Sequence, residues 1–257
     1  MFAKKRACVL LTASEVVAMR GAGRAAAETL TMVSRRIAPG VTTADIDSWV
    51  RAHTAEQGGR PSQLGYQGFP AAVCTSRNAV VCHGIPSRTE VLNNGDIINV
   101  DVTTELNGFH GDTSRTFVLG EVSREVRHVV SVAERCLWAG IQVVRHGARL
   151  GDIGAAIEAL AKREGCSVVR DFGGHGIGRH MHQEPHVSHH GKTGTGMRLK
   201  AGMALTIEPM INLGGPEVII LDDDWTVVTL DSSPSAQFEH TVLVTHDGYE
   251  VLTLPAA

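Results

Sequence analysis

Four carboxylic acids stand where an isolated charge would be costly to bury. Asp101 and Glu208 each interrupt an apolar, strand-like segment, and Asp112 and Glu239 each lie near the start of another. A buried carboxylate needs a cation or dense hydrogen bonding to compensate its charge. Four acids in one cavity would raise each other's pKa values unless divalent cations held them together, and two ions balance the charge better than one. The chemistry this predicts is hydrolysis by a water shared between two metals.

Strand alternation indicates which neighbours accompany the acids. Around Asp101 it places Asn99 and Thr103 on the same face as the acid, with apolar residues on the other. Around Glu208 it places Thr206 on the face of the acid. For either acid alone, a position on a half-exposed sheet is the competing interpretation.

A histidine-rich segment is the natural place to look for a nitrogen ligand. Six histidines fall between His175 and His190, and glycines surround the first of them, which suits close backbone approach and sharp turning. Spacing alone does not single out His175. The segment could equally be a metal-scavenging surface tract.

The elements that must position these groups recur along the chain. Cap and stop signals predict helices over 15–37 and 43–57, and again over 123–145 and 152–164. An offset of 107 residues relates the two sets, and it also carries Asp101 onto Glu208. It pairs the following glycines: Gly40 with Gly147, Gly58 with Gly165, and Gly95 with Gly202.

The second pair of acids fits the same repeat with an insertion. Asp112 and Glu239 are 127 residues apart, and the 20 extra residues fall between Glu208 and Glu239, where turn signals predict added strands. The sequence therefore predicts an α+β fold of two related halves, about 15–120 and 121–257, within one catalytic domain over 15–257. Residues 1–14 would form a short N-terminal extension.

Bulk composition is ordinary. The 257 residues carry a formal charge of -3 and are 43% hydrophobic, which argues against a disordered chain and against a strongly cationic nucleic-acid binder. No segment approaches the roughly 20 apolar residues of a membrane span. The five cysteines lack CxxC spacing, and a reduced cytoplasm is the expected location.

Several motifs resemble those of type I methionine aminopeptidases, in order from about residue 15 to residue 254. They are Cys-His-Gly-Ile-Pro at 82–86, Asn-Val-Asp-Val-Thr at 99–103, Gly-His-Gly-Ile-Gly-Arg at 174–179, Thr-Ile-Glu-Pro-Met at 206–210 and Phe-Glu-His-Thr at 238–241. The resemblance implies the pita-bread (creatinase/aminopeptidase-like) fold, a pseudo-two-fold repeat of helices and antiparallel strands around a central metal site.

The resemblance also implies roles for the ligands. Asp101 would chelate one divalent ion, His175 and Glu208 would serve the other, and Asp112 and Glu239 would bridge both. The donor set suits Co, Mn, Fe or Zn without selecting among them.

Three catalytic roles follow from the same resemblance. His83 would contact the substrate near the scissile amide. His182 would stabilise the oxyanion, which requires a donor aimed at the transition state. Glu208 would also carry a proton to the leaving amine. On their own, both histidines could be satisfied structural residues.

A methionine pocket is implied around an apolar set of side chains: Tyr66, Phe69, Cys74, Met181 and Trp225. Phe69 and Met181 replace aromatics more usual in the family, and Gln63 stands where an apolar residue or cysteine is often found. Cys74 could instead be a buried core residue. The remaining histidines of the tract are expected at the surface or in loops: His180, where the family commonly has a small residue, His186, His189 and His190.

The implied function is hydrolysis of the N-terminal methionine of nascent proteins, preferably before a small residue, through a metal-bridging water. The expected partners are nascent chain termini, with ribosome association open, no specific nucleic acid, no membrane, and a monomeric state. Proline-specific aminopeptidases or dipeptidases of the same fold are the main alternative, although the roughly 14 residues before the first helix are too few for their usual N-terminal domain. A non-catalytic binding module is the other alternative.

Overall fold

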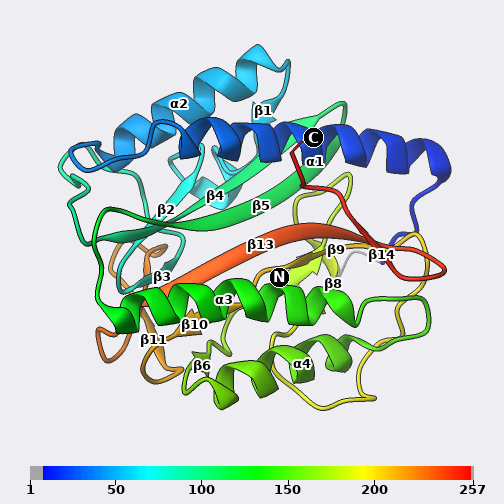
Figure 1. The fold of residues 1–257 in the computed structure, drawn as a ribbon. Helices are drawn as coiled ribbons and strands as arrows, with labels where there is room; N and C mark the ends of the chain where they lie inside the picture. Colours follow the sequence, from blue (N-terminus) through cyan, green and yellow to red (C-terminus); the bar gives the residue numbers. More distant parts are fainter. Residues whose placement is uncertain (1–7, 256–257) are drawn as a thin grey trace.

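The computed structural model describes residues 8–255, so residues 1–7 of the predicted extension lie outside it (Figure 1). The helices of this part of the chain are α1 (Ala13–Ser34), α2 (Thr43–Glu56), α3 (Arg124–Gln142) and α4 (Leu150–Arg163), with a 3₁₀ turn at Tyr66–Gly68. The strands of the first half are β1 (Arg60–Pro61), β2 (Cys74–Arg77), β3 (Val80–Cys82), β4 (Ile97–Leu106) and β5 (Phe109–Val118). Those of the second half are β6 (Ser167–Val168), β7 (Gly174–Gly176), β8 (Gln183–Val187), β9 (Ala204–Ile207), β10 (Met210–Asn212), β11 (Val218–Ile220), β12 (Val227–Thr229), β13 (Ser235–Val244) and β14 (Tyr249–Val251).

One large antiparallel sheet joins the two halves. Its main path runs β1-β4-β5-β13-β9-β7-β8, so β5 of the first half pairs with β13 of the second at the centre. Helices α1 and α3 run across β5 and β13, with α2 and α4 beyond them (Figure 1). The predicted α+β class is confirmed.

The repeat deduced from the sequence is visible in backbone conformation. Helix α4 has the bounds of α2 shifted by 107 residues. An isolated bridge joins Thr42 to Val91, and its counterpart joins Arg149 to Arg198 at the same offset. The three glycine pairs have nearly equal positive φ values, such as +95° and +92° at the residues that precede β4 and β9. Positive φ favours glycine, which explains why these positions match in type.

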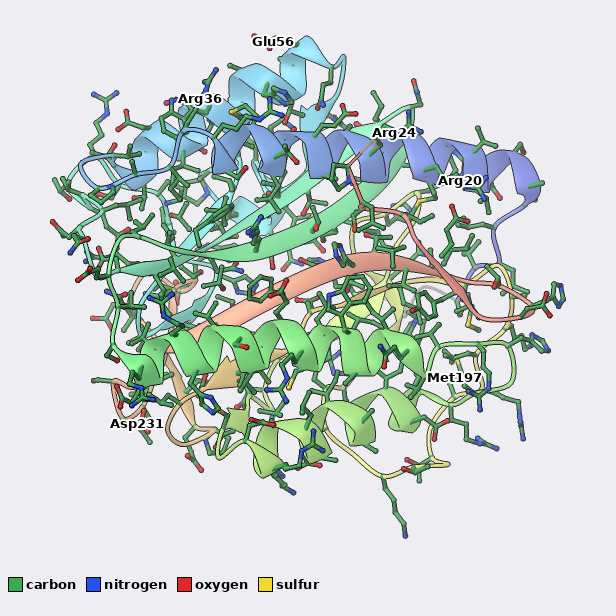
Figure 2. The ribbon with its side chains drawn as sticks, in the orientation of Figure 1. Arg20, Arg24, Arg36, Glu56, Met197 and Asp231 are labelled. Carbon is green, nitrogen blue, oxygen red and sulfur yellow. The ribbon has the colours of Figure 1, made fainter. Side chains whose placement is uncertain are left out.

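The helices bury one face of the sheet and leave the other to the acids. Ile98, Val100 and Val102 of β4 pack into a core cluster with residues of α1 and α2. Leu205 and Ile207 of β9 pack into the corresponding cluster with residues of α3 and α4. Arg24 of α1 and Glu56 of α2, both labelled in Figure 2, are exposed to solvent. Alternation therefore turns the acids to the helix-free face, as expected.

Helix boundaries differ from the prediction by a few residues. Helix α1 begins at Ala13 because Thr12 caps it and forms a capping box with Glu15. It ends at Ser34 rather than at residue 37, and α3 ends at Gln142 rather than at residue 145. The boundary expected at residue 14 thus falls inside α1, and the division into an extension and one domain stays a prediction. Among the described residues, no helix is long and apolar enough to cross a membrane.

The second half departs from the first at Glu208-Pro209. Strand β4 continues unbroken through Asp101, but its counterpart is divided into β9 and β10, and Glu208 lies in the gap. Proline has no N–H to donate to a ladder, which accounts for the break. The predicted added strands are β11 and β12, which pair with each other, and β12 also pairs with β3 of the first half.

Candidate metal centre

A single cavity of about 240 Å³ brings the predicted site residues together. Its lining includes every one of them: Tyr66, Phe69, Cys74, His83, Asp101, Asp112, His175, Met181, His182, Glu208, Trp225 and Glu239. These residues come from both halves of the chain, so the cavity exists only when the halves are joined.

The five predicted ligands converge at the base of this cavity. Ligand atoms of Asp112, His175 and Glu239 all lie within 4.8 Å of one another. His175 Nε2 lies 3.6 Å from Glu208 Oε1 and 3.8 Å from Asp112 Oδ2. Besides burial, the charge of Asp112 raises the pKa of Asp101, as expected for two carboxyl groups close to each other. No two of the five predicted ligands lie in the same strand.

The electrostatics of the cluster are unfavourable without a cation. Burial raises the pKa of Asp112 to about 7 and, with the charge of Asp112, that of Glu208 to about 8. Burial and the neighbouring acids also raise the pKa values of Asp101 and Glu239. Burial lowers the pKa of His175, which keeps the imidazole neutral and able to donate a lone pair.

Two carboxylate oxygens of the cluster lack a hydrogen-bond partner among the described residues, which bears on whether the cluster suits a metal ion. Asp101 Oδ1 and Glu239 Oε1 are buried and have no hydrogen-bond partner within the described chain. A buried acceptor left without a partner destabilises the fold by about 1–3 kcal/mol, more when it is charged. Carboxylate oxygens with one imidazole are ligands for hard or borderline divalent cations. The donor set therefore fits such ions.

Glycines allow His175 to enter the cluster. A Cβ at Gly174 would lie 2.2 Å from the Thr206 carbonyl oxygen, and one at Gly176 would lie 2.2 Å from that of Glu184. No side chain fits at either position, because strand β7 is held tightly between β8 and β9. The glycines on either side of His175 are thus required by packing.

Hydroxyl and amide groups orient the carboxylates. Thr103 Oγ1 donates to Asp112 Oδ1 at 2.7 Å, and Thr206 Oγ1 donates to Glu208 Oε1 at 2.8 Å. Gln237 Nε2 donates to Glu208 Oε2 at 3.3 Å. Strand alternation had placed the two threonines beside the acids, and the same rule applied to β13 would have placed Gln237 on the face of Glu239.

His83 stands above the cluster in a conformation that few histidines adopt. Its φ is +57°, in the left-handed region, which costs of order 1–3 kcal/mol and persists where surrounding contacts enforce it. Its ring packs edge-on against Phe172 and Trp225, with centroids 5.6 and 6.2 Å away. A Cβ on Gly84 would lie 2.1 Å from the Thr75 carbonyl, so the chain approaches β2 closely just after His83.

His182 lies at the mouth of the cavity and against the cluster. Its ring centroid is 4.2 Å from that of His175, and its Nδ1 is hydrogen-bonded to the Tyr66 hydroxyl at 2.8 Å. Desolvation lowers its pKa to about 4, so the ring is neutral near pH 7. If Tyr66 donates to Nδ1, then Nε2 carries the proton and can donate it to a ligand.

The other side chains that line the cavity are either apolar or held by hydrogen bonds. Phe69 and Trp225 pack edge to face at 5.1 Å. Cys74 is buried, and burial raises the pKa of its thiol, which is therefore not a nucleophile. Gln63, noted above as a departure, is buried and donates to the Asp101 carbonyl oxygen at 2.9 Å. Gln63 thus stiffens the strand that carries the acid.

His189 lies in the loop after β8, one of the two expected places, but it is buried rather than at the surface. His180 and His186 are exposed and His190 is half-buried, but His189 is 1% exposed and its Nε2 accepts the Glu208 N–H at 3.1 Å. Burial lowers its pKa to about 3. Extending the alternation of β8 by two residues would have placed His189 on the buried face with Val187.

Comparison with known proteins supplies a family. A model described as metallopeptidase family M24 matches residues 17–246. A protein named methionine aminopeptidase A, from Synechocystis sp., is 51% identical over 245 residues, which cover 95% of this chain and 97% of the relative.

Solved structures agree with the architecture. The crystal structure of methionine aminopeptidase from Rickettsia prowazekii has a TM-score of 0.95 and 46% identity, covering 96% of this chain and 100% of that one. A Xaa-Pro dipeptidase from Bacillus anthracis has a TM-score of 0.77 and 21% identity, covering 95% of this chain and 61% of the dipeptidase. At that identity the second likeness concerns the fold alone. The predicted pita-bread fold is confirmed.

Proposed function

The chain belongs to metallopeptidase family M24, and from this we propose that it is a methionine aminopeptidase. It hydrolyses the peptide bond after the N-terminal methionine of a nascent polypeptide, preferably when the next residue is small. The observation that carries the proposal is the convergence of four acids and His175 at the base of a cavity with an apolar wall.

We propose that this cluster holds two divalent metal ions, which would be Co, Mn, Fe or Zn. Asp101 would hold one ion, His175 and Glu208 the other, and Asp112 and Glu239 would bridge them. The unpaired oxygens of Asp101 and Glu239 and the raised pKa values of the acids support this assignment. When bound, a metal pair lowers the pKa of a water molecule and polarises the scissile carbonyl group.

The protein groups around the cluster have separate tasks. His182 donates from Nε2 to the carbonyl oxygen as negative charge develops on it, with Tyr66 fixing the tautomer. Glu208 accepts a proton from the attacking water and passes it to the leaving amine. His83, held in place by Phe172 and Trp225, contacts the scissile amide.

The wall formed by Phe69, Cys74, Met181 and Trp225 would receive the methionine side chain. An unbranched thioether gains from soft and aromatic contacts of this kind. Action on nascent chains would place the protein in the cytoplasm, and we expect it to be a monomer there.

Methionine release from the tripeptide Met-Ala-Ser tests the proposal. The purified protein, stripped of metal and reloaded with Mn(II) or Co(II), should bind two ions per chain and release methionine, whereas Leu-Ala-Ser and Met-Leu-Ser serve as controls for the first and second residues. Two bound ions without release would favour a binding module. Faster cleavage of Xaa-Pro peptides than of Met-Ala-Ser would shift the assignment to the proline-specific relatives.

A further inference from the structure

Glu208 lacks the backbone support that Asp101 receives. Asp101 lies within β4 and is paired with Cys74 of β2 on one side and Ser114 of β5 on the other. Glu208 follows the last residue of β9 and precedes Pro209, so no strand ladder continues through it. A ligand at a break in a sheet needs other contacts to hold its position.

His189 provides the hydrogen-bond acceptor that a neighbouring strand would otherwise offer to the Glu208 N–H. The N–H of Glu208 donates to His189 Nε2 at 3.1 Å, and the imidazole is almost completely buried. Residues 188–190 are packed closely on α4, where a Cβ at Gly154 would lie 2.3 Å from the His190 carbonyl oxygen. The backbone of Glu208 is thereby tied to a rigid part of the second half.

Thr206 fixes the carboxylate and links it to the histidine ligand. Its hydroxyl donates to Glu208 Oε1 at 2.8 Å and accepts the N–H of His175 at 2.9 Å. The single hydroxyl proton and one lone pair are thus used on two neighbouring ligands. The counterpart of Thr206 in the first half, Asn99, instead donates to the Gln237 carbonyl oxygen at 2.8 Å and makes no such link.

We propose that Thr206 and His189 are positioning residues that hold Glu208 and His175 in a common geometry and set the metal affinity of that side of the centre. This inference rests on the proposed function for the identity of the ligands. It assigns the positioning of Glu208 to two residues outside the set of proposed ligands.

Calorimetric titration of the metal-free protein with Mn(II) tests the role of Thr206. Thr206→Val keeps the shape but removes the hydroxyl, and one of the two ions should bind about 10- to 100-fold more weakly, the usual effect of losing such a partner. Thr206→Ser should recover most of the affinity. Thr104→Val is the matched control, because Thr104 is also fully buried in the sheet but its hydroxyl has no hydrogen-bond partner among the described residues.

A second pair of variants tests His189 in the same assay. His189→Leu removes the acceptor and should weaken the same ion, whereas His189→Gln can present its amide oxygen near the position of Nε2 and should recover affinity. Co(II) absorption should report altered ligand geometry in the Leu and Val variants only.

The outcomes separate this inference from the proposed function. Wild-type affinity for both ions in Thr206→Val and His189→Leu would overturn the positioning role, even if the loaded protein releases methionine. Equal losses in Thr206→Val and Thr104→Val would also overturn it, since the effect would be one of general packing. Wild-type protein that binds two ions but releases no methionine would count against the proposed function and leave the affinity comparison intact.

Discussion

The proposed metal ligands are placed here at the expense of the metal-free fold. Glu239 is 2% exposed, one of its oxygens has no partner in the described chain, and three other acids surround it. Such crowding is typical of functional sites, where stability is sacrificed for chemistry. The consequence can be measured on one residue at a time.

Glu239→Gln should stabilise the metal-free protein while abolishing turnover. Glutamine cannot ionise, so the variant avoids both the repulsion between buried charges and the cost of protonating a buried carboxyl group, and a gain of about 1 kcal/mol would raise the Tm by roughly 2–4 °C for a chain of this size. The rise in Tm on adding Mn(II) should disappear in the variant. Thermal melts with and without metal provide the measurement, and a lower metal-free Tm in Glu239→Gln would contradict the argument from charge crowding.

His182→Ala should impair the chemical step without emptying the metal site. Loss of one donor to a developing oxyanion lowers kcat by about 10²- to 10³-fold. Tyr66→Phe should cause a smaller loss, because only the hydrogen bond that orients His182 is removed. Steady-state kinetics with Met-Ala-Ser and metal analysis of both variants test this, and loss of bound metal in His182→Ala would show that the histidine acts as a ligand.

At the scale of elements, close approach between strands brings the ligands within range of one another. Strand β7 carries His175 into the cluster because its glycines let it lie against β9 and β8. The turn that precedes β4 positions the strand that carries Asp101. In this turn Asp96 accepts a hydrogen bond from the Asn93 N–H.

Gly174→Ala should be strongly destabilising. The new methyl group would lie 2.2 Å from a backbone carbonyl oxygen that cannot move without breaking the β7–β9 pairing. Overpacking of this kind costs typically about 1–3 kcal/mol and sometimes more. Gly21→Ala is the matched control, since no atom lies within 4 Å of that Cβ in α1 and alanine favours a helix by about 1 kcal/mol. Chemical denaturation should therefore show a lower free energy of unfolding than wild type for Gly174→Ala and a higher one for Gly21→Ala.

Asp96→Asn should destabilise the protein more at neutral pH than in acid. Burial alone would raise the pKa of Asp96, but hydrogen bonds from Asn78, the Asn93 N–H and Arg77 outweigh it and lower the pKa. A lowered folded-state pKa contributes stability above the unfolded value of about 3.9 and loses it as the pH falls through the folded value.

Urea unfolding at pH 7 and near pH 3 tests that sign. The free energy of unfolding should fall by about 1–3 kcal/mol in Asp96→Asn at pH 7, and the difference from wild type should shrink in acid. An equal difference at both pH values would mean that the charge of Asp96 plays no part.

For the whole molecule, the two halves meet at the cluster of proposed metal ligands. Bound metal should therefore stabilise the contact between the halves. Asp101 and Asp112 come from the first half, and His175, Glu208 and Glu239 come from the second. The pairing of β5 with β13 brings these sets together. Ions that bind only the folded arrangement stabilise it by mass action.

Removal of metal by a chelator should therefore abolish methionine release and lower the Tm together. Free metal at about 100 times its Kd contributes about 2.7 kcal/mol to stability, and both properties should return on reloading with Mn(II) or Co(II). Activity that survives complete chelation, checked by metal analysis, would refute the metal-dependent mechanism.

The sequence by itself determined the helices, the repeat, the four acids and the methionine aminopeptidase motifs. These features are local or periodic: caps and glycines of positive φ recur at one offset, and strand alternation places Asp101 and Glu208 opposite an apolar face. His175 had to be taken from the resemblance, because spacing within the histidine tract did not distinguish it. Only the folded chain showed that its neighbouring glycines are required by packing.

The tertiary structure alone decided the contacts between segments distant in the sequence. His189 was expected at the surface or in a loop, but the fold buries it at the break at Glu208-Pro209 as a partner of Glu208. The link from His175 through Thr206 to Glu208 likewise depends on β7 and β9 lying side by side. Periodicity gives the face on which a side chain lies, whereas the atom that it meets there is set by the register between strands far apart in the chain.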